Sequence, residues 1–228
     1  MAQLADGDGV ASVLAAQRAY YDQRAPDYLG ASSADRASPG ALPRELLDAV
    51  VDELAPRGDV LELACGPGGF TRALARHAAS LTAVDGSPAM LARNRAQFGA
   101  DEVTFVEADL FAWEPDDRYD LVFFGFWLSH VPPSRFDDFW ALVARCLRPD
   151  GRVAFVDEDD RAAERTDGFE VDGVPLATRT LRDGRTVDIV KVFWDPSDLQ
   201  RRLDGIGWHV DVASMGASFL VGTGRRHR

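Results

Sequence analysis

The chain has 228 residues, of which 46% are hydrophobic, and its formal net charge is −12. This length suffices for one well-buried domain, and the acidic balance disfavours a nucleic-acid surface, since binding phosphate backbones depends on clustered Lys and Arg. Lys191 is the only lysine among 25 basic residues, which leaves almost nothing for mechanisms that need a lysine Schiff base. A negative field repels anionic substrates, so any anion bound here requires local arginines.

Cysteine and histidine usage gives no metal signature. Cys65 and Cys146 are isolated, which fits a reducing compartment, and the four histidines form no H-E-x-x-H cluster. The N-terminus lacks a basic region followed by an apolar core, and "LVFFGFWL" is too short to span a bilayer. We therefore expect a cytoplasmic protein, monomeric or homodimeric, with a small-molecule substrate and no metal, nucleic-acid or membrane partner.

Between Gly58 and Gly151, short apolar runs alternate with helical patterns, which predicts β-α-β units and a parallel sheet. The runs are "DVLELA", "LTAVD", "VTFVEAD", "YDLVFF" and "GRVAFVDE". Ser87 followed by Pro88 is typical of a helix start, and "SRFDDFWALVARCL" predicts a helix whose apolar face points to the core.

The second half of the chain departs from this alternation. After the polar "DEDDRAAERTDG", the segment "ATRTLRDGRTVDIVKVFW" predicts a hairpin through Asp183-Gly184. Asp195 and Pro196 open a helix, and two short strands around Met215-Gly216 close the chain. We expect one domain over residues 1–228, with an N-terminal helix and loop within residues 1–40 and the hairpin inserted within residues 160–194.

A glycine-rich turn, "CGPGG", follows the first strand, where backbone N–H groups can approach a ligand closely. Alone it is a weak signal, because dinucleotide enzymes and methyltransferases share such a turn. Three acids predicted at three successive strand ends are more specific: Glu62, Asp85 and Asp109. Asp85 is placed to accept ribose hydroxyls, and Asp109 can accept an adenine amino group.

The motifs "VLELACGPGGFT", "LTAVDGSPAML", "VEADLF" and "LRPDGRVAFVDE" resemble those of class I S-adenosylmethionine-dependent methyltransferases, over roughly residues 20–222. The resemblance implies an α/β, Rossmann-like seven-stranded sheet with an antiparallel last strand, and here a β-hairpin lid added after strand 5. It also implies S-adenosylmethionine as cofactor and S-adenosylhomocysteine as product. The implied cofactor-binding residues are Tyr21, Glu62, Gly66, Pro67, Gly68, Asp85, Gly86, Ser87, Met90, Asp109, Leu110, Gly125 and Phe126.

A closer resemblance rests on "FWLSHVP", "FVDEDD", "RTLRDGR" and "IVKVF", which are similar to the phosphonate O-methyltransferase of dehydrophos biosynthesis and its relatives. It implies that Arg179 holds an anionic head of the acceptor and that Trp127 and His130 lie at its pocket. The "YYDQRAPDY" segment resembles an entry helix that closes over the cofactor. The implied substrate-binding residues are Tyr28, Trp127, His130, Arg179 and Arg185, with His130 the catalytic candidate.

The leading hypothesis is an O-methyltransferase acting on a small anionic natural-product intermediate, a phosphonate or carboxylate. Such an oxygen is already ionised at neutral pH, so His130 would orient the acceptor. In a second hypothesis, the acceptor is a phenol, an alcohol or an amine, and His130 is the general base. A third is a nucleotide-binding module without chemistry.

Overall fold

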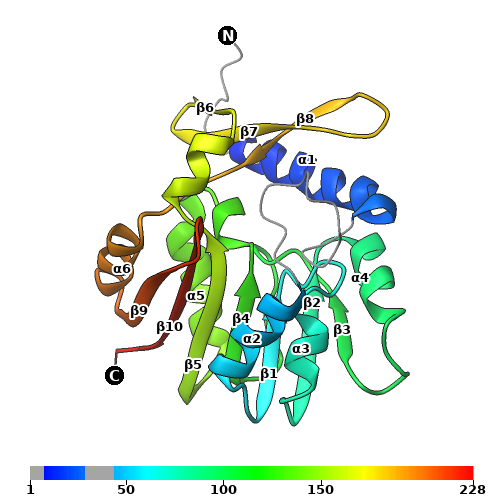
Figure 1. Cartoon of the computed structure of the whole chain (residues 1–228), viewed down its shortest axis with the longest axis vertical. Coiled ribbons are helices and arrows are strands. Elements are labelled where there is room, and N and C mark those ends of the chain that lie inside the picture. Colours follow the sequence, from blue (N-terminus) through cyan, green and yellow to red (C-terminus); the bar gives the residue numbers. More distant parts are fainter. Residues whose placement is uncertain (1–7, 29–43, 228) are drawn as a thin grey trace.

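The computed structural model describes residues 8–28 and 44–227 (Figure 1). A seven-stranded sheet in the order β3-β2-β1-β4-β5-β10-β9 forms its centre. Strands β1 to β5 run parallel, and β10 is antiparallel to both of its neighbours, β5 and β9. The strands are β1 (Asp59–Leu63), β2 (Ser80–Asp85), β3 (Thr104–Glu107), β4 (Tyr119–Gly125), β5 (Leu147–Glu158), β9 (Trp208–Met215) and β10 (Phe219–Arg226).

Helices cover both faces of this sheet, which explains why its central strands are buried along most of their length and mostly apolar. On one face, α5 (Phe136–Cys146) and α6 (Pro196–Asp204) pack against a cluster that includes Trp140, Phe124 and Phe155. On the other face, α2 (Arg44–Leu54) and α3 (Thr71–Ala75) pack against a cluster that includes Phe123. Helix α4 (Pro88–Arg95) follows β2. The predicted sheet and its alternation with helices are therefore confirmed.

The predicted apolar face of α5 is buried as expected. Phe136, Phe139, Trp140 and Val143 are all at most 1% exposed, and Leu147 already begins β5. The predicted pair of C-terminal strands is present as β9 and β10, and β10 inserts between β5 and β9. This arrangement provides the antiparallel last strand that the methyltransferase motifs imply.

A second, three-stranded sheet in the order β6-β7-β8 follows β5. Strands β7 (Val174–Thr180) and β8 (Thr186–Val190) are the predicted hairpin, and Gly184 in its turn has φ +84°. Strand β6 (Gly168–Val171) is an addition to the predicted hairpin. It turns into β7 through Asp172 and Gly173, which both have positive φ, as a two-residue hairpin turn requires.

Helix α1 (Asp8–Arg24) lies between the two sheets, beneath β7 and β8 and above the carboxyl ends of the parallel strands (Figure 1). A short 3₁₀ helix, η1 (Ala25–Asp27), follows it. The predicted loop after this helix falls partly on residues 29–40, which lie outside the described residues. Three further 3₁₀ helices are η2 (Leu128–His130), η3 (Pro133–Arg135) and η4 (Asp160–Arg165).

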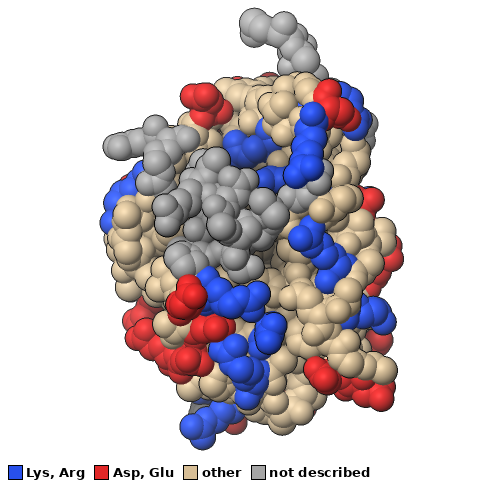
Figure 2. Space-filling view, turned by 45° about the vertical axis from the view of Figure 1, so that its right-hand side comes forward, with Lys and Arg blue, Asp and Glu red and all other residues tan. Residues whose placement is uncertain are grey.

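Within residues 8–28 and 44–227, no helix has both the length and the apolar character that crossing a membrane demands. Charged side chains are unevenly spread over the surface. Figure 2 shows groups of basic side chains beside groups of acidic ones on one face, although the net charge is −12. Local positive regions are therefore compatible with an acidic chain.

Candidate cofactor and acceptor site

A cavity of about 410 Å³ lies at the carboxyl ends of β1, β2 and β4, with α1 as its roof. This is where open parallel sheets bind ligands, and the volume is in the usual range for small-molecule sites. Most predicted site residues line it. They are Tyr21, Tyr28, Glu62, Gly66, Pro67, Asp85, Gly86, Ser87, Met90, Asp109, Leu110, Gly125, Phe126, Trp127 and His130.

Gly66 and Gly68 lie in the turn after β1, and different structural constraints favour glycine at the two positions. Gly66 has φ +52°, and a Cβ built on it would meet nothing within 4 Å, so its backbone faces open space in the cavity. Gly68 has φ +94°, and a Cβ there would lie 2.3 Å from Oδ1 of Asn94. Gly68 is not among the described residues that line the cavity. Packing against α4 therefore explains Gly68, whereas Gly66 is shaped for a ligand.

Glu62, on β1, is 2% exposed and lines the cavity. Its Oε2 atom has no hydrogen-bond partner among the described residues. Burial raises the pKa of Glu62 to about 8, and a hydrogen bond from Thr71 acts in the opposite direction. A buried carboxyl oxygen without a partner favours a ligand that brings a hydrogen-bond donor or a positive charge.

Asp85, at the end of β2, is held between two backbone amides. Oδ2 accepts a hydrogen bond from Gly66 N at 2.8 Å, and Oδ1 accepts one from Ser87 N at 2.8 Å. Burial raises the pKa of Asp85, and these amide bonds partly offset that rise. The carboxylate thus joins the glycine turn to the start of α4 and retains lone pairs for a ligand in the cavity.

Ser87 caps α4 as predicted, since its Oγ accepts a hydrogen bond from Met90 N at 3.1 Å. The same hydroxyl donates to Oδ1 of Asp22 in α1 at 2.8 Å, and Ala89 N donates to that oxygen at 3.1 Å. Asp22 therefore adds a carboxylate to the N-terminus of α4, where the helix dipole favours negative charge.

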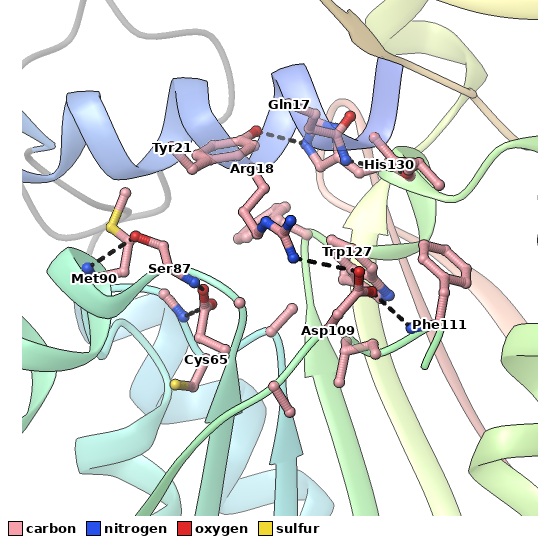
Figure 3. Close-up of a pocket in the computed structure, with 18 of the residues that line it drawn as sticks. Gln17, Arg18, Tyr21, Cys65, Ser87, Met90, Asp109, Phe111, Trp127 and His130 are labelled. Atoms are coloured by element: carbon pink, nitrogen blue, oxygen red, sulfur yellow. Dashed lines mark hydrogen bonds and ion pairs between the residues drawn. The ribbon is translucent and has the colours of Figure 1, made fainter. Parts of the chain in front are cut away.

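Asp109 lies two residues beyond the end of β3, and its carboxylate is half exposed. Oδ1 accepts a hydrogen bond from Phe111 N at 3.0 Å. Oδ2 forms an ion pair with Nη1 of Arg18 in α1 at 3.3 Å (Figure 3). The predicted partner of Asp109 is an adenine amino group, and the structure adds an arginine from the roof of the cavity.

His130 is buried, and its hydrogen bonds define its tautomer. Nδ1 lies 2.8 Å from the carbonyl oxygen of Val190, which only accepts, so Nδ1 carries the proton. Nε2 then accepts from the Tyr21 hydroxyl at 2.9 Å (Figure 3). Burial, followed by the nearby Lys191 charge, holds the pKa of His130 well below 6.5. His130 could accept a proton from an acceptor only through Nε2, and for this the hydrogen bond from Tyr21 to Nε2 would have to break.

Gln17 supports the same network from α1. It is 3% exposed, its Oε1 accepts a hydrogen bond from Val190 N at 3.0 Å, and its Nε2 donates to the His130 carbonyl at 3.3 Å. The helix, the second sheet and η2 are thus joined by one buried amide. Burial raises the pKa of Tyr21 well above 10, so its hydroxyl stays protonated as the donor to His130.

The hairpin arginines have different surroundings. Arg179 is paired in register with Val187, and Val187 packs against the cluster of Tyr20, Leu181 and Ile189, so Arg179 lies on the hairpin face that meets α1. Its Nη1 donates to the neighbouring Thr178 carbonyl at 3.3 Å, and it makes no ion pair with any acid among the described residues. Neither Arg179 nor Arg185 is among the described cavity-lining residues.

Arg185 lies in the hairpin turn and is engaged by two neighbours. It pairs with Asp183 at 2.7 Å and donates to Oε1 of Gln23 at 2.7 Å. Lys191 is 7% exposed, pairs with Glu158 and donates to Ser129 Oγ at 3.0 Å. Of these three basic residues, Arg179 alone has no acidic partner among the residues that the structure describes.

Sequence reasoning missed most of the roof. These lining residues belong to α1, and they are Ala11, Leu14, Ala15, Gln17 and Arg18. Their spacing of three and four residues puts them on one helix face, but small and polar side chains give this helix no strong apolar stripe. Further unpredicted lining residues are Ala64, Cys65, Gly69, Phe70, Ala108, Phe111, Ala112 and Arg135.

The sheet order, the glycine turn and the strand-end acids define a class I S-adenosylmethionine-dependent methyltransferase. The cavity fits this cofactor, because Gly66 leaves open space beside the backbone and Glu62 offers a buried oxygen without a partner. A family model described as "Methyltransferase domain" matches residues 60–151.

Solved structures extend the match to nearly the whole chain. DhpI in complex with SAH is 38% identical, covers 95% of this chain and 98% of its own, and has a TM-score of 0.80. DhpI in complex with SAM and HEP is 39% identical, covers 93% of this chain and 97% of its own, and has a TM-score of 0.78. The chain therefore belongs to the S-adenosylmethionine-dependent methyltransferases, with S-adenosylmethionine as cofactor.

Two further matches cover less of the chain or are less identical to it. The trans-aconitate 2-methyltransferase of Escherichia coli O139:H28 (strain E24377A / ETEC) is 38% identical over 97 residues, which are 42% of this chain and 37% of that protein. The match thus spans little more than a third of the length of these curated relatives. A Burkholderia thailandensis 1,6-didemethyltoxoflavin-N1-methyltransferase, 22% identical with a TM-score of 0.66 over 100% of this chain and 93% of its own, shares the fold.

Proposed function

We propose that this methyltransferase transfers the methyl group to an oxygen of a small anionic acceptor, a phosphonate or a carboxylate. The observation that carries the proposal is Arg179, a cation that lies on the hairpin face that meets α1 and has no acidic partner among the described residues. Arginine matches the oxygens of such anions in a bidentate manner. The likeness to DhpI, which was crystallised with SAM and HEP, supports the same class of acceptor.

The residues around the cavity have separate roles in this proposal. Gly66, Asp85, Ser87, Met90 and Asp109 hold the cofactor, with the ribose at Asp85 and the adenine between α4 and Asp109. Glu62 faces the amino-acid end, because its unpartnered oxygen can accept from an ammonium group. Gly125 and Phe126 form the wall at the end of β4.

When bound, S-adenosylmethionine supplies an electrophilic methyl group on a sulfonium. The chain has to position the acceptor oxygen in line with that methyl group and exclude water. A phosphonate or carboxylate oxygen is ionised at neutral pH and needs no general base. The neutral His130 then acts through Tyr21, whose hydroxyl it fixes, and Trp127 and Tyr28 shape the acceptor space.

Calorimetric titration with S-adenosylhomocysteine, repeated in the presence of methylphosphonate and of acetate, tests the proposal. In the wild type, we expect either anion to strengthen the binding of S-adenosylhomocysteine. In Arg179→Gln this strengthening should disappear, because the cation that attracts the anion is gone. Arg185→Gln is the matched control, because Arg185 is engaged by Asp183 and Gln23, and it should behave like the wild type. Equal anion effects in wild type and Arg179→Gln would contradict the anionic acceptor site.

A further inference from the structure

Helix α1 is held to the two sheets by different kinds of contact. Toward the three-stranded sheet, apolar packing predominates: Leu14 packs against the cluster that includes Val190, and Tyr20 packs with Leu181 and Ile189. Two hydrogen bonds add to it, from Val190 N to Gln17 and from Arg185 to Gln23. Toward the carboxyl ends of the seven-stranded sheet, the side-chain hydrogen bonds and ion pairs of the described residues include those of Arg18, Tyr21 and Asp22. Apolar packing with two added hydrogen bonds thus ties α1 to the second sheet, while Arg18, Tyr21 and Asp22 hold it over the cavity through polar contacts.

Arg18 makes the polar contact that crosses the cavity. Its Cδ lies 3.2 Å from where a Cβ on Gly86 would be, so its aliphatic part rests on the backbone after β2. Its Nη1 reaches Asp109 Oδ2 at 3.3 Å, on the far side of the opening beyond β3 (Figure 3). Because Gly86 and Asp109 both line the cavity, the side chain spans the end where the nucleotide part of the cofactor is proposed to lie.

We propose that the Arg18–Asp109 ion pair is a latch that retains the cofactor, and Arg18 is its positioning residue. The inference rests on the proposed placement of the adenine beside Asp109. A carboxylate has lone pairs for both the arginine and an adenine amino group, so the latch and the ligand can share Asp109. A nucleotide beneath this side chain cannot leave toward α1 until the pair separates.

The exposure of the pair sets the size of the effect. Both side chains are 48% exposed, and such pairs are weak and screened by salt. Loss of the latch should therefore accelerate cofactor release by about two- to fivefold rather than abolish binding. Release from the wild type should also accelerate with ionic strength, because salt weakens the same pair.

The first experiment measures dissociation of S-adenosylhomocysteine by stopped flow, with excess S-adenosylmethionine as competitor. Arg18→Gln should release the ligand faster than the wild type. Its release rate should not rise further when NaCl is increased from about 0.02 M to about 0.5 M, whereas the wild-type rate should rise. Arg76→Gln is the matched control, because Arg76 pairs with Asp48 between α3 and α2 and is 43% exposed. Equal or slower release from Arg18→Gln would overturn the latch.

A second measurement needs no ligand. Hydrogen exchange of peptides that cover residues 18–24 should be faster in ligand-free Arg18→Gln than in the wild type, and Arg18→Lys should restore part of the protection. Unchanged exchange in Arg18→Gln would overturn the latch even if the proposed function stands. A wild type that binds no S-adenosylhomocysteine would instead overturn the proposed cofactor placement, and the retention role with it.

Discussion

Glu62 is a residue whose placement favours ligand binding over stability of the empty protein. Its carboxyl group is buried beside the cavity with one oxygen lacking a partner, and burial raises its pKa to about 8. An isolated buried carboxylate is unfavourable unless a donor or a cation approaches it. The amino-acid end of S-adenosylmethionine supplies such a cation, so the proposed ligand relieves the cost of burial.

Replacement of Glu62 by glutamine should therefore stabilise the ligand-free protein at alkaline pH. Between the ordinary Glu pKa of 4.5 and the folded value of about 8, the folded state binds more protons than the unfolded state. The contribution of Glu62 to stability is thus fully present below pH 4.5 and is lost as pH rises toward 8. We expect Glu62→Gln to raise Tm by roughly 5 °C at pH 8.

Thermal unfolding of the two proteins at several pH values checks this expectation. The difference in Tm should shrink toward pH 5, and affinity for S-adenosylhomocysteine should fall in Glu62→Gln. Glu107→Gln is the control at an exposed position and should leave Tm unchanged. A Glu62→Gln protein that is less stable than the wild type at pH 8 would contradict the assignment of a buried, ligand-seeking carboxyl.

Motif spacing predicted the residues contributed by the strand ends, because a strand fixes where its last side chains lie. Asp85 was predicted from its strand end, and Gly66 and Ser87 from the motif resemblance, and all three line the cavity. Their contact with the cofactor stays a prediction. Arg18 and Gln17 were missed because their partners are 91 and 113 residues away in sequence, and neither helix pattern nor charge identifies such partners. The family resemblance singled out Arg179, but the residues alone did not separate it from Arg185, and the strand register and the turn now show their different surroundings.

At the scale of elements, neighbouring strands restrict the sequence of β10. It lies between β5 and β9 in the sheet. A Cβ on Gly224 would lie 2.1 Å from the carbonyl oxygen of His209, and the neighbouring atoms belong to backbone that cannot rotate away. The glycine therefore permits close approach of β9 to β10 at this register.

Gly224→Ala should destabilise the protein by about 2–3 kcal/mol, since the added methyl group forces the two strands apart. Urea unfolding measures the change. Gly205→Ala is the matched control: Gly205 ends α6 with φ −64°, and the nearest atom to a Cβ there lies 3.4 Å away, so its effect should stay within about 0.5 kcal/mol. Similar destabilisation in both variants would contradict the explanation that the close approach of β9 and β10 requires glycine at position 224.

Elements with a clear hydrophobic period were predicted well from the sequence, including α5 and the parallel strands. Strand β6 was missed because "GFEV" is short and mostly exposed, although the Asp172-Gly173 dipeptide after it is a hairpin signal like Asp183-Gly184. Exposed strands bury little apolar surface, so their residues carry a weak pattern.

At the scale of the molecule, the cavity joins segments that are far apart in the sequence. The cavity is floored by strand ends from residues 62–127 and roofed by α1, which in turn packs on β8. Sequence patterns predicted the floor and the hairpin separately. The placement of the roof depends on contacts between segments more than a hundred residues apart, which local patterns do not encode.

S-adenosylhomocysteine should stabilise the whole assembly. At about 100-fold above its Kd, a ligand that binds only the folded state adds about 2.7 kcal/mol, which is roughly 5–10 °C in Tm for a chain of this size. Differential scanning fluorimetry measures the shift. Asp85→Ala should lose it, whereas Asp188→Ala, on the hairpin, should keep it. Retention of the full shift in Asp85→Ala would contradict the ribose site.

The single lysine has a practical consequence for anyone who handles this protein. Lys191 is 7% exposed and is held by Glu158 and Ser129, and every other basic side chain apart from histidine is an arginine. Amine-reactive dyes, glutaraldehyde and activated-ester resins therefore have no accessible side-chain amine on the folded chain. Such reagents should attach at the α-amino group, which turns non-selective coupling chemistry into end-specific labelling.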